Sequence, residues 1–192
     1  MNTPIYSATD PAHGNRATGA EVCLTSLTNG SSASKQPPGY QWAKKYVEGS
    51  SFGASPSRFA INACHLIPDK GMGGSGKDLR NLSTCGRSVN ANRQLPSDPG
   101  MPDNMRAFEI GALYAVREGE TVHYRVTPIY DGDRTVPAYY LMESQGVTAD
   151  GEIGLDQSDL VPNVAFSPVP GQAANIGKVS VNGKPVPLGS TP

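Results

Sequence analysis

The apolar side chains of residues 121–127 fall on every second position. A period of two is typical of a β-strand with one buried face. The turn-forming residues 130–133 follow, and we expect residues 135–144 to supply a partner strand. We therefore expect a β-hairpin here, and we interpret it as scaffold.

A different period governs residues 104–117. Their apolar positions recur every three to four residues, as on one face of an α-helix, and they are Met105, Phe108, Ala112 and Val116. Asn104 can serve as the N-cap, because its side-chain oxygen can accept a hydrogen bond from the first turn. We predict a helix over this range and a shorter one over residues 40–47.

The region before the longer helix contains a strand, a glycine-rich loop and a second strand. Residues 58–67 have the apolar character of a strand, and this strand carries His65. The glycines within residues 71–76 require a loop, because they permit positive φ values that other residues resist. Residues 81–84 form the returning strand, so that Asn90 falls between this strand and the helix.

The ends of the chain show weaker patterns. Residues 21–27 indicate a strand, and residues 29–34 have the composition of a loop or a Ser/Gly linker. Residues 147–192 contain six prolines and no helical period. We divide the chain into three parts: an N-terminal extension (1–35), a central domain (36–146) and an extended Pro/Gly-rich tail (147–192).

Composition favours one core with few helices. A chain of 192 residues with 37% hydrophobic content can bury a single good core. Its 22 glycines and 17 prolines exceed average shares of about 7% and about 5%. We expect an α+β fold with long loops.

The sequence predicts a soluble protein that does not span a membrane. It contains no run of about 18 apolar residues, and its N-terminus lacks a basic region followed by an apolar one. No signal peptide is visible, so export would use another route.

The net charge of −1 hides an uneven distribution. Residues 35–106 carry ten Lys and Arg against five Asp and Glu. A basic segment around His65 is what a phosphate-backbone substrate would favour. Ordinary solvated surface charge is the alternative.

Three cysteines are too few for a disulfide scaffold and lack the paired spacing of a structural zinc site. Cys64 and Cys85 flank the glycine loop and can face each other across a hairpin. They are either two reduced thiols or one bridge, because the outcome depends on Cα separation and redox compartment.

Several blocks occur in an order that is more specific than any one of them. They are Cys64-His65-Leu66-Ile67, Gly73-Gly74-Ser75-Gly76, Arg80-Asn81-Leu82, Asn90, Arg106-Ala107-Phe108-Glu109 and residues 124–132. In these blocks, which span roughly residues 36–146, the chain resembles the DNA/RNA non-specific endonucleases of the ββα-metal, or His-Me finger, superfamily. The resemblance implies a strand, loop, strand and helix packed on an antiparallel sheet.

Phosphodiester hydrolysis needs a nucleophilic water and a cation that stabilises negative charge. His65 is the candidate general base, since histidine has an unperturbed pKa of about 6.5. By resemblance, Asn90 holds the metal, Mg²⁺ or Mn²⁺, with Asn92 as its competitor. A hard cation needs few protein oxygens, because water and substrate phosphate supply the rest.

Other residues of the candidate catalytic site are assigned by the same resemblance. Asn81 holds the loop and the metal site in place and does not touch the ion. Glu109 can hydrogen-bond a water on the metal, with an exposed helix glutamate as the alternative. Arg106 is a further catalytic candidate. His13 and His123 are expected to be structural.

The chain departs from the family motif Asp-Arg-Gly-His by having Cys64 in place of the glycine and Ala63 in place of the arginine. Either the cation near the transition state comes from elsewhere, with Arg58, Arg87, Arg93 and Arg106 as the candidates, or catalysis is slower. A catalytically degenerate ββα-metal fold that serves as a binding or structural module of a secreted assembly is the alternative function.

The resemblance also implies partners and a location. DNA is the expected substrate, with RNA as a second one, and the candidate substrate-binding residues are Arg58, Lys77, Arg80 and Arg87. Relatives of this kind are often toxin domains of secreted bacterial proteins, delivered into target cells by a secretion system. A producer of such a toxin needs an acidic immunity or inhibitor protein.

Overall fold

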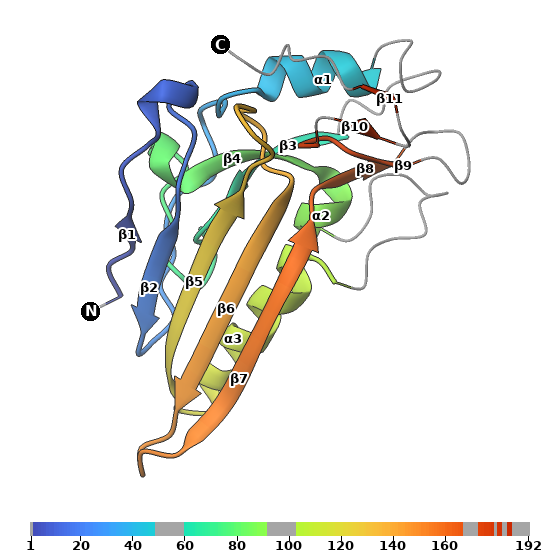
Figure 1. The fold of residues 1–192 in the computed structure, drawn as a ribbon. Helices are drawn as coiled ribbons and strands as arrows, with labels where there is room; N and C mark the ends of the chain where they lie inside the picture. Colours follow the sequence, from blue (N-terminus) through green and yellow to red (C-terminus); the bar gives the residue numbers. More distant parts are fainter. Residues whose placement is uncertain are drawn as a thin grey trace.

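The protein is built on one five-stranded antiparallel sheet (Figure 1). The structure is a computed structural model that describes residues 2–48, 60–91, 103–166 and 173–178, together with the short strands β10 and β11. The strand order is β1-β2-β5-β6-β7. The strands are β1 (Ile5–Tyr6), β2 (Ala20–Leu24), β5 (Thr121–Ile129), β6 (Tyr139–Val147) and β7 (Ile153–Pro162).

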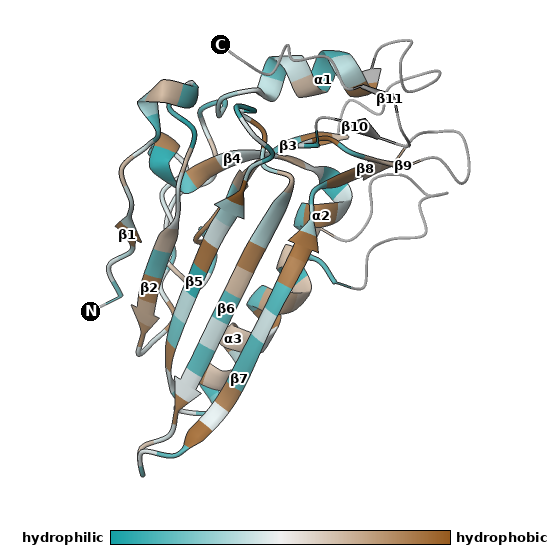
Figure 2. Cartoon of the chain, viewed as in Figure 1, coloured by the Kyte–Doolittle hydropathy of each residue, from teal (hydrophilic) through white to brown (hydrophobic). Residues whose placement is uncertain are grey.

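The hairpin predicted from the period of two is confirmed. Thr121 of β5 pairs with Val147 of β6, and the register continues to Ile129 and Tyr139. Residues of β5 alternate between buried and exposed. Figure 2 shows the matching bands of hydrophilic and hydrophobic residues along β5, β6 and β7.

The expected C-terminal tail is wrong for residues 153–162. This segment forms β7, which pairs with β6 along its length. Its exposed and half-buried positions alternate, but few of them are strongly apolar, so the sequence signal was weak. Pairing with the long neighbour β6 supplies the hydrogen bonds that make it a strand.

The N-terminal segment also contributes to this sheet. The predicted strand over residues 21–27 is found as β2, which lies between β1 and β5. The sheet thus takes strands from all three parts into which the sequence was divided.

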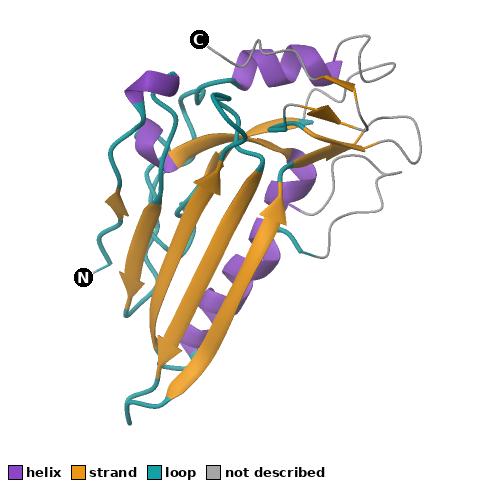
Figure 3. Ribbon diagram, viewed as in Figure 1, coloured by secondary structure: helices purple, strands orange, loops and turns teal. Residues whose placement is uncertain are grey.

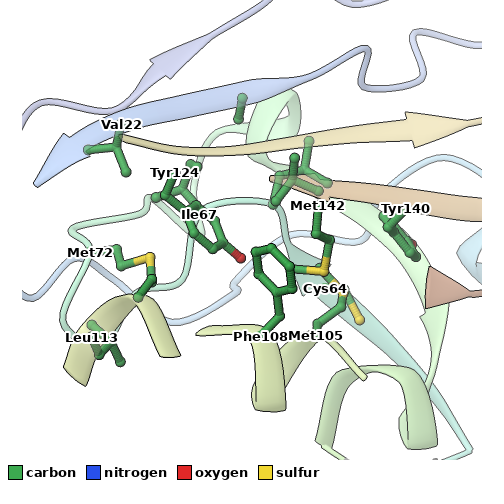
Figure 4. Packing of buried hydrophobic residues seen from close by; sticks show 14 of the residues in the cluster. Val22, Cys64, Ile67, Met72, Met105, Phe108, Leu113, Tyr124, Tyr140 and Met142 are labelled. Atoms are coloured by element: carbon green, nitrogen blue, oxygen red, sulfur yellow. The ribbon is translucent and has the colours of Figure 1, made fainter. Parts of the chain in front are cut away.

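Helix α3 (Met105–Arg117) lies along one face of the sheet (Figure 3). As predicted, Asn104 is its N-cap, and its side chain accepts a hydrogen bond of 2.9 Å from the Ala107 N–H. The apolar face of α3 packs against β5, β6 and β7. Figure 4 shows Phe108 beside Tyr124 and Met142, and the rings of Phe108 and Tyr124 meet edge to face at 6.1 Å.

Replacing Asn104 by alanine should lower the free energy of unfolding by about 1 kcal/mol, because an N-terminal amide of α3 loses its acceptor. Urea denaturation followed by circular dichroism measures the change. Asn104→Asp should retain most of the stability as a control. An unchanged midpoint in Asn104→Ala would contradict the capping role.

A second unit crosses the end of the sheet (Figure 1). Strands β3 (Ile61–His65) and β4 (Leu82–Gly86) form an antiparallel hairpin, and α2 (Arg87–Ala91) follows directly. The hairpin is joined to the sheet where the Tyr140 hydroxyl lies 2.9 Å from Ser83 Oγ. The predicted order of strand, loop, strand and helix is therefore present, with the short helix α2 added before α3.

The remaining elements surround this hairpin. The predicted helix over residues 40–47 is α1 (Tyr40–Glu48), which packs against β3 and β4. The others are the 3₁₀ turns η1 (Pro11–His13) and η2 (Leu79–Asn81) and the strands β8 (Val164–Phe166), β9 (Ala173–Asn175), β10 (Ser180–Val181) and β11 (Lys184–Pro185). None of the described helices is long and apolar enough to cross a membrane.

Cys64 and Cys85 form a disulfide across the β3–β4 hairpin, with their Cα atoms 5.9 Å apart. The sequence had left a bridge and two thiols as alternatives. Both cysteines are fully buried, whereas Cys23 is exposed and free. The bridge fixes the strand that carries His65 to the strand that leads into α2.

Replacing both bridged cysteines by alanine should lower the free energy of unfolding by about 2–3 kcal/mol, since the bridge closes a loop of 21 residues. Denaturation with and without a thiol reductant measures this loss. Cys23→Ser is the matched control and should unfold like the wild type. If reductant left the wild-type midpoint unchanged, the bridge would not contribute.

Candidate active site

His65 is the last residue of β3, and its side chain is half-buried. Its Nε2 atom lies 3.1 Å from the carbonyl oxygen of Ser31. A carbonyl only accepts hydrogen bonds, so Nε2 carries the proton of the neutral ring. The lone pair is then on Nδ1, which is the nitrogen that can act as a base.

The carbonyl that orients His65 is itself fixed by the glycine loop. Gly76 donates its N–H to Ser31 O at 2.8 Å, and Ser31 donates its own N–H to Gly74 O at 3.0 Å. Two parallel bridges join residues 28–34 to residues 71–76. Of the two interpretations that the composition allows for residues 29–34, a loop or a linker, the structure shows a loop, which these backbone hydrogen bonds hold in place.

The glycines are needed for more than the turn. Gly71 has a positive φ of 85°, as expected for a tight reversal. A Cβ on Gly74 would lie 1.7 Å from Ile67 O, and a Cβ on Gly76 would lie 2.1 Å from Ser32 O. The backbone of the glycine loop can therefore approach the neighbouring segments this closely only at glycine. The approach of Gly76 to residues 31–32 places the Ser31 carbonyl that accepts from the imidazole.

Asn81 fastens the start of the loop to its end. It is fully buried, and its Oδ1 accepts the Ile67 N–H at 2.8 Å. Its Nδ2 donates to Ile67 O at 3.0 Å and to Ser75 O at 3.2 Å. The Asn81 carboxamide thus hydrogen-bonds both the N–H and the carbonyl oxygen of Ile67, two residues after His65.

Glu109 is buried on the first turns of α3, which excludes the alternative of an exposed helix glutamate. Burial raises the pKa of Glu109 to about 7, although the Arg106 guanidinium 3.4 Å away favours the charged form. The carboxylate of Asp69, in the loop after His65, raises this pKa further. Glu109 and the His65 loop are therefore close enough to interact electrostatically.

Packing against α3 confirms this proximity. A Cβ on Gly71 would lie 2.5 Å from the Leu113 side chain, one helical turn after Glu109. Burial is the main cause of the raised pKa of the Tyr124 hydroxyl, and the nearby Glu109 carboxylate raises this pKa further. That hydroxyl has no hydrogen-bond partner among the described residues.

Asn90 lies on α2 and is half-buried. Helix α2 packs against β3, which carries His65, and against α3, which carries Glu109. These packed elements carry an amide oxygen (Asn90), a carboxylate (Glu109) and an imidazole (His65), and their packing does not by itself place the three side chains around one point. Asn92, the competing candidate, lies outside the described residues.

This donor set suits a hard divalent cation, which prefers oxygen ligands and keeps several waters. The described part of the chain contains no cluster of three or more His, Cys, Asp and Glu that could hold a metal by itself. A cation held by the Asn90 amide would therefore rely on water and phosphate oxygens.

The family described as DNA/RNA non-specific endonuclease matches residues 2–148. The chain belongs to this family. The match covers four strands of the sheet, β1, β2, β5 and β6, and the β3–β4–α2 unit. No curated protein matches the chain.

Solved structures of nucleases share the fold of this endonuclease. NucA from Streptococcus agalactiae, solved with no metal bound, is 20% identical with a TM-score of 0.59, covering 90% of this chain and 78% of that chain. A structure described as an extracellular endonuclease is 17% identical with a TM-score of 0.57, covering 90% and 85%. Sda1 nuclease, solved with a bound zinc ion, is 21% identical with a TM-score of 0.57, covering 84% and 74%.

The candidate substrate-binding Lys and Arg side chains of this endonuclease differ in exposure and in pairing. Lys77 is exposed and lines a shallow depression together with Lys35 and Asp78. Arg80 is held by Asp78, with Nη2 and Oδ2 2.6 Å apart, so that its charge is locally compensated. Arg87 is half-buried at the start of α2, and Arg58 and Arg93 lie outside the described residues. Arg106 pairs with Glu109.

The other histidines of this endonuclease lie outside the site. His13 Nδ1 is 2.7 Å from Asp10, and His123 Nε2 is 3.3 Å from Glu21 on an exposed strand position. Sequence reasoning missed Ser31 and Asp69. A serine that acts through its carbonyl leaves no side-chain signal, and Asp69 could have been noticed only as the acid nearest the motif.

Proposed function

We propose that this endonuclease hydrolyses phosphodiester bonds of DNA, and of RNA as a second substrate, with His65 as the general base. The observation that carries the proposal is the hydrogen bond from His65 Nε2 to Ser31 O, which leaves Nδ1 as the proton acceptor. Buried Glu109 and the amide of Asn90 lie on the two helices that pack together at this hairpin.

The reaction needs one proton transfer at His65. Nδ1 takes a proton from water as the oxygen attacks phosphorus, and the bond from phosphorus to the leaving oxygen breaks. Asn90 would hold Mg²⁺ or Mn²⁺, which stabilises negative charge on the phosphate and leaving oxygen. Glu109 orients water at this site, and Asn81 maintains the loop that follows the base.

Arg106 is the proposed cation nearest the reacting phosphate. Its guanidinium is about half exposed, and its pairing with Glu109 directs it toward the carboxylate of the site. It therefore replaces the arginine that the motif lacks beside His65. Lys77, Arg80, Arg87 and Arg58 are proposed to contact the substrate backbone, with Arg80 weakened in this role by Asp78.

Degradation of plasmid DNA and of RNA tests the proposal. The wild type should cleave in the presence of Mg²⁺ or Mn²⁺, lose activity in EDTA and regain it when the ion is restored. Asn90→Ala should require a metal concentration at least about tenfold higher. Asn92→Ala separates the two candidate ligands, and metal-independent cleavage would overturn the metal assignment.

A role as the toxin domain of a secreted bacterial system is also proposed. The Cys64–Cys85 disulfide supports it, since such bridges persist in oxidising compartments outside the cytoplasm. An acidic immunity protein would cover the basic residues near the site and be captured rapidly through charge complementarity. Harmless expression of the chain in an oxidising compartment would count against the toxin role.

The alternative is a degenerate fold that serves as a binding module of a secreted assembly, and the missing arginine of the motif favours it. In that case the wild type would bind nucleic acid without cleaving it in any of these ions.

A further inference from the structure

Helix α3 presents an exposed stripe on the side away from the sheet. The stripe consists of Arg106, Ile110, Tyr114 and Arg117, which follow each other at intervals of three to four residues. Ile110 is 52% exposed and Tyr114 is 61% exposed, although the opposite face of the same helix is buried. Two large apolar side chains are thus open to solvent next to two arginines.

The stripe begins at the candidate active site. Arg106 pairs with Glu109, and the loop after His65 packs against α3 where Gly71 approaches Leu113. Lys70 is exposed and adjoins Gly71 in the loop that packs against Leu113 of α3. Arg106 and Arg117 therefore flank Ile110 and Tyr114 along the helix, and Lys70 lies in the adjoining loop. Glu109, one residue before Ile110, is buried.

We propose that this stripe binds a single-stranded segment of the nucleic-acid substrate as it runs away from the scissile bond. One base stacks on Tyr114 and packs against Ile110, while Lys70 and Arg117 contact flanking phosphates. Aromatic platforms between cations are the common means of binding single strands without sequence preference. The inference rests on the proposed function and names the surface that would extend its site.

The dimensions of the stripe fit this occupant. From Arg106 to Arg117 the helix rises about 16 Å. A stacked strand advances about 3.4 Å per nucleotide, so the stripe spans about five nucleotides. Such a contact would let the enzyme hold a strand beyond the bond that it cleaves, without reading base edges.

Fluorescence anisotropy with a labelled oligothymidine, in EDTA and on the His65→Ala background to suppress cleavage, tests the proposal. Adding Tyr114→Ala should weaken binding about tenfold, within the range of base stacking on an aromatic residue. Tyr114→Trp should restore the affinity, because it retains a stacking face. Leu160→Ala is the matched control, since Leu160 is 51% exposed on the other face of the sheet.

The phosphate contacts have their own readout. Arg117→Ala should lower the slope of log affinity against log salt concentration by about 0.7, as expected for one lost contact to a single strand. Arg125→Ala removes an exposed arginine from the other face of the sheet and should leave the slope unchanged.

Cleavage of bis(p-nitrophenyl) phosphate, which is too small to reach the stripe, reports on the proposed reaction separately. If the wild type cleaved this compound while Tyr114→Ala and Arg117→Ala bound the oligonucleotide like their parent, the stripe would not bind nucleic acid and the proposal would be overturned. If the wild type cleaved nothing while Tyr114→Ala weakened binding, the stripe would stand and the hydrolase assignment would fail.

Discussion

Replacing His65 by alanine is expected to lower the rate of DNA cleavage by about 10³-fold, within the range that a positioned general base supplies. The reason is that the variant lacks the imidazole, whose Nδ1 atom is the proposed acceptor of the proton from water. Initial rates on supercoiled plasmid at fixed metal concentration measure the loss.

Added imidazole should restore part of the activity of His65→Ala, because the missing base can diffuse into the space left by the side chain. His123→Ala is the matched control, since His123 is a second histidine on an exposed strand position. A His65→Ala protein that unfolds like the wild type and still cleaves at the wild-type rate would exclude His65 as the base.

Glu109→Gln should make the metal-free protein more stable at alkaline pH by about 3 kcal/mol, while lowering cleavage by about 10–100-fold. The folded protein raises the pKa of Glu109 to about 7 from a model value of 4.5. The native state therefore binds more protons than the unfolded state between these values, and its stability falls as pH rises through this window. A neutral amide removes this loss.

Denaturation in EDTA at several pH values tests the expectation. The two proteins should have similar stability near pH 4, and their stabilities should separate as the pH rises to about 7 and differ by a constant amount above it. Glu118→Gln, at the exposed end of α3, should give no such divergence. Parallel curves for Glu109→Gln and the wild type would mean that the carboxyl is not held in a destabilising environment.

Local patterns predicted the elements that carry their own signal. The β5–β6 hairpin has a strict period of two, and α3 has a helical period with Asn104 at its start, so each could be recognised without knowing its neighbours. The position of His65 at the end of a strand followed from the glycine loop after it. The buried state of Glu109 could not be derived, because burial depends on the sheet beneath the helix.

The features that were missed are set by distant partners. β7 is a strand because β6 lies beside it, and residues 28–34 are ordered because the glycine loop accepts and donates their hydrogen bonds. Composition describes a segment in isolation, so it indicated a tail at the first place and a loop or a linker at the second. The roles of Asn90 and Arg106 stay predictions, since they depend on a bound ion and substrate.

The contact between Ser31 O and the imidazole has a practical consequence for anyone who prepares a shortened protein. A fragment that starts at residue 36, where the sequence suggests a convenient boundary, would keep His65, Asn90 and Glu109 but lose both β2 and the carbonyl that sets the tautomer. The ring could then rotate and protonate at either nitrogen. Truncation at that point would give an inactive fragment although every named catalytic side chain is retained.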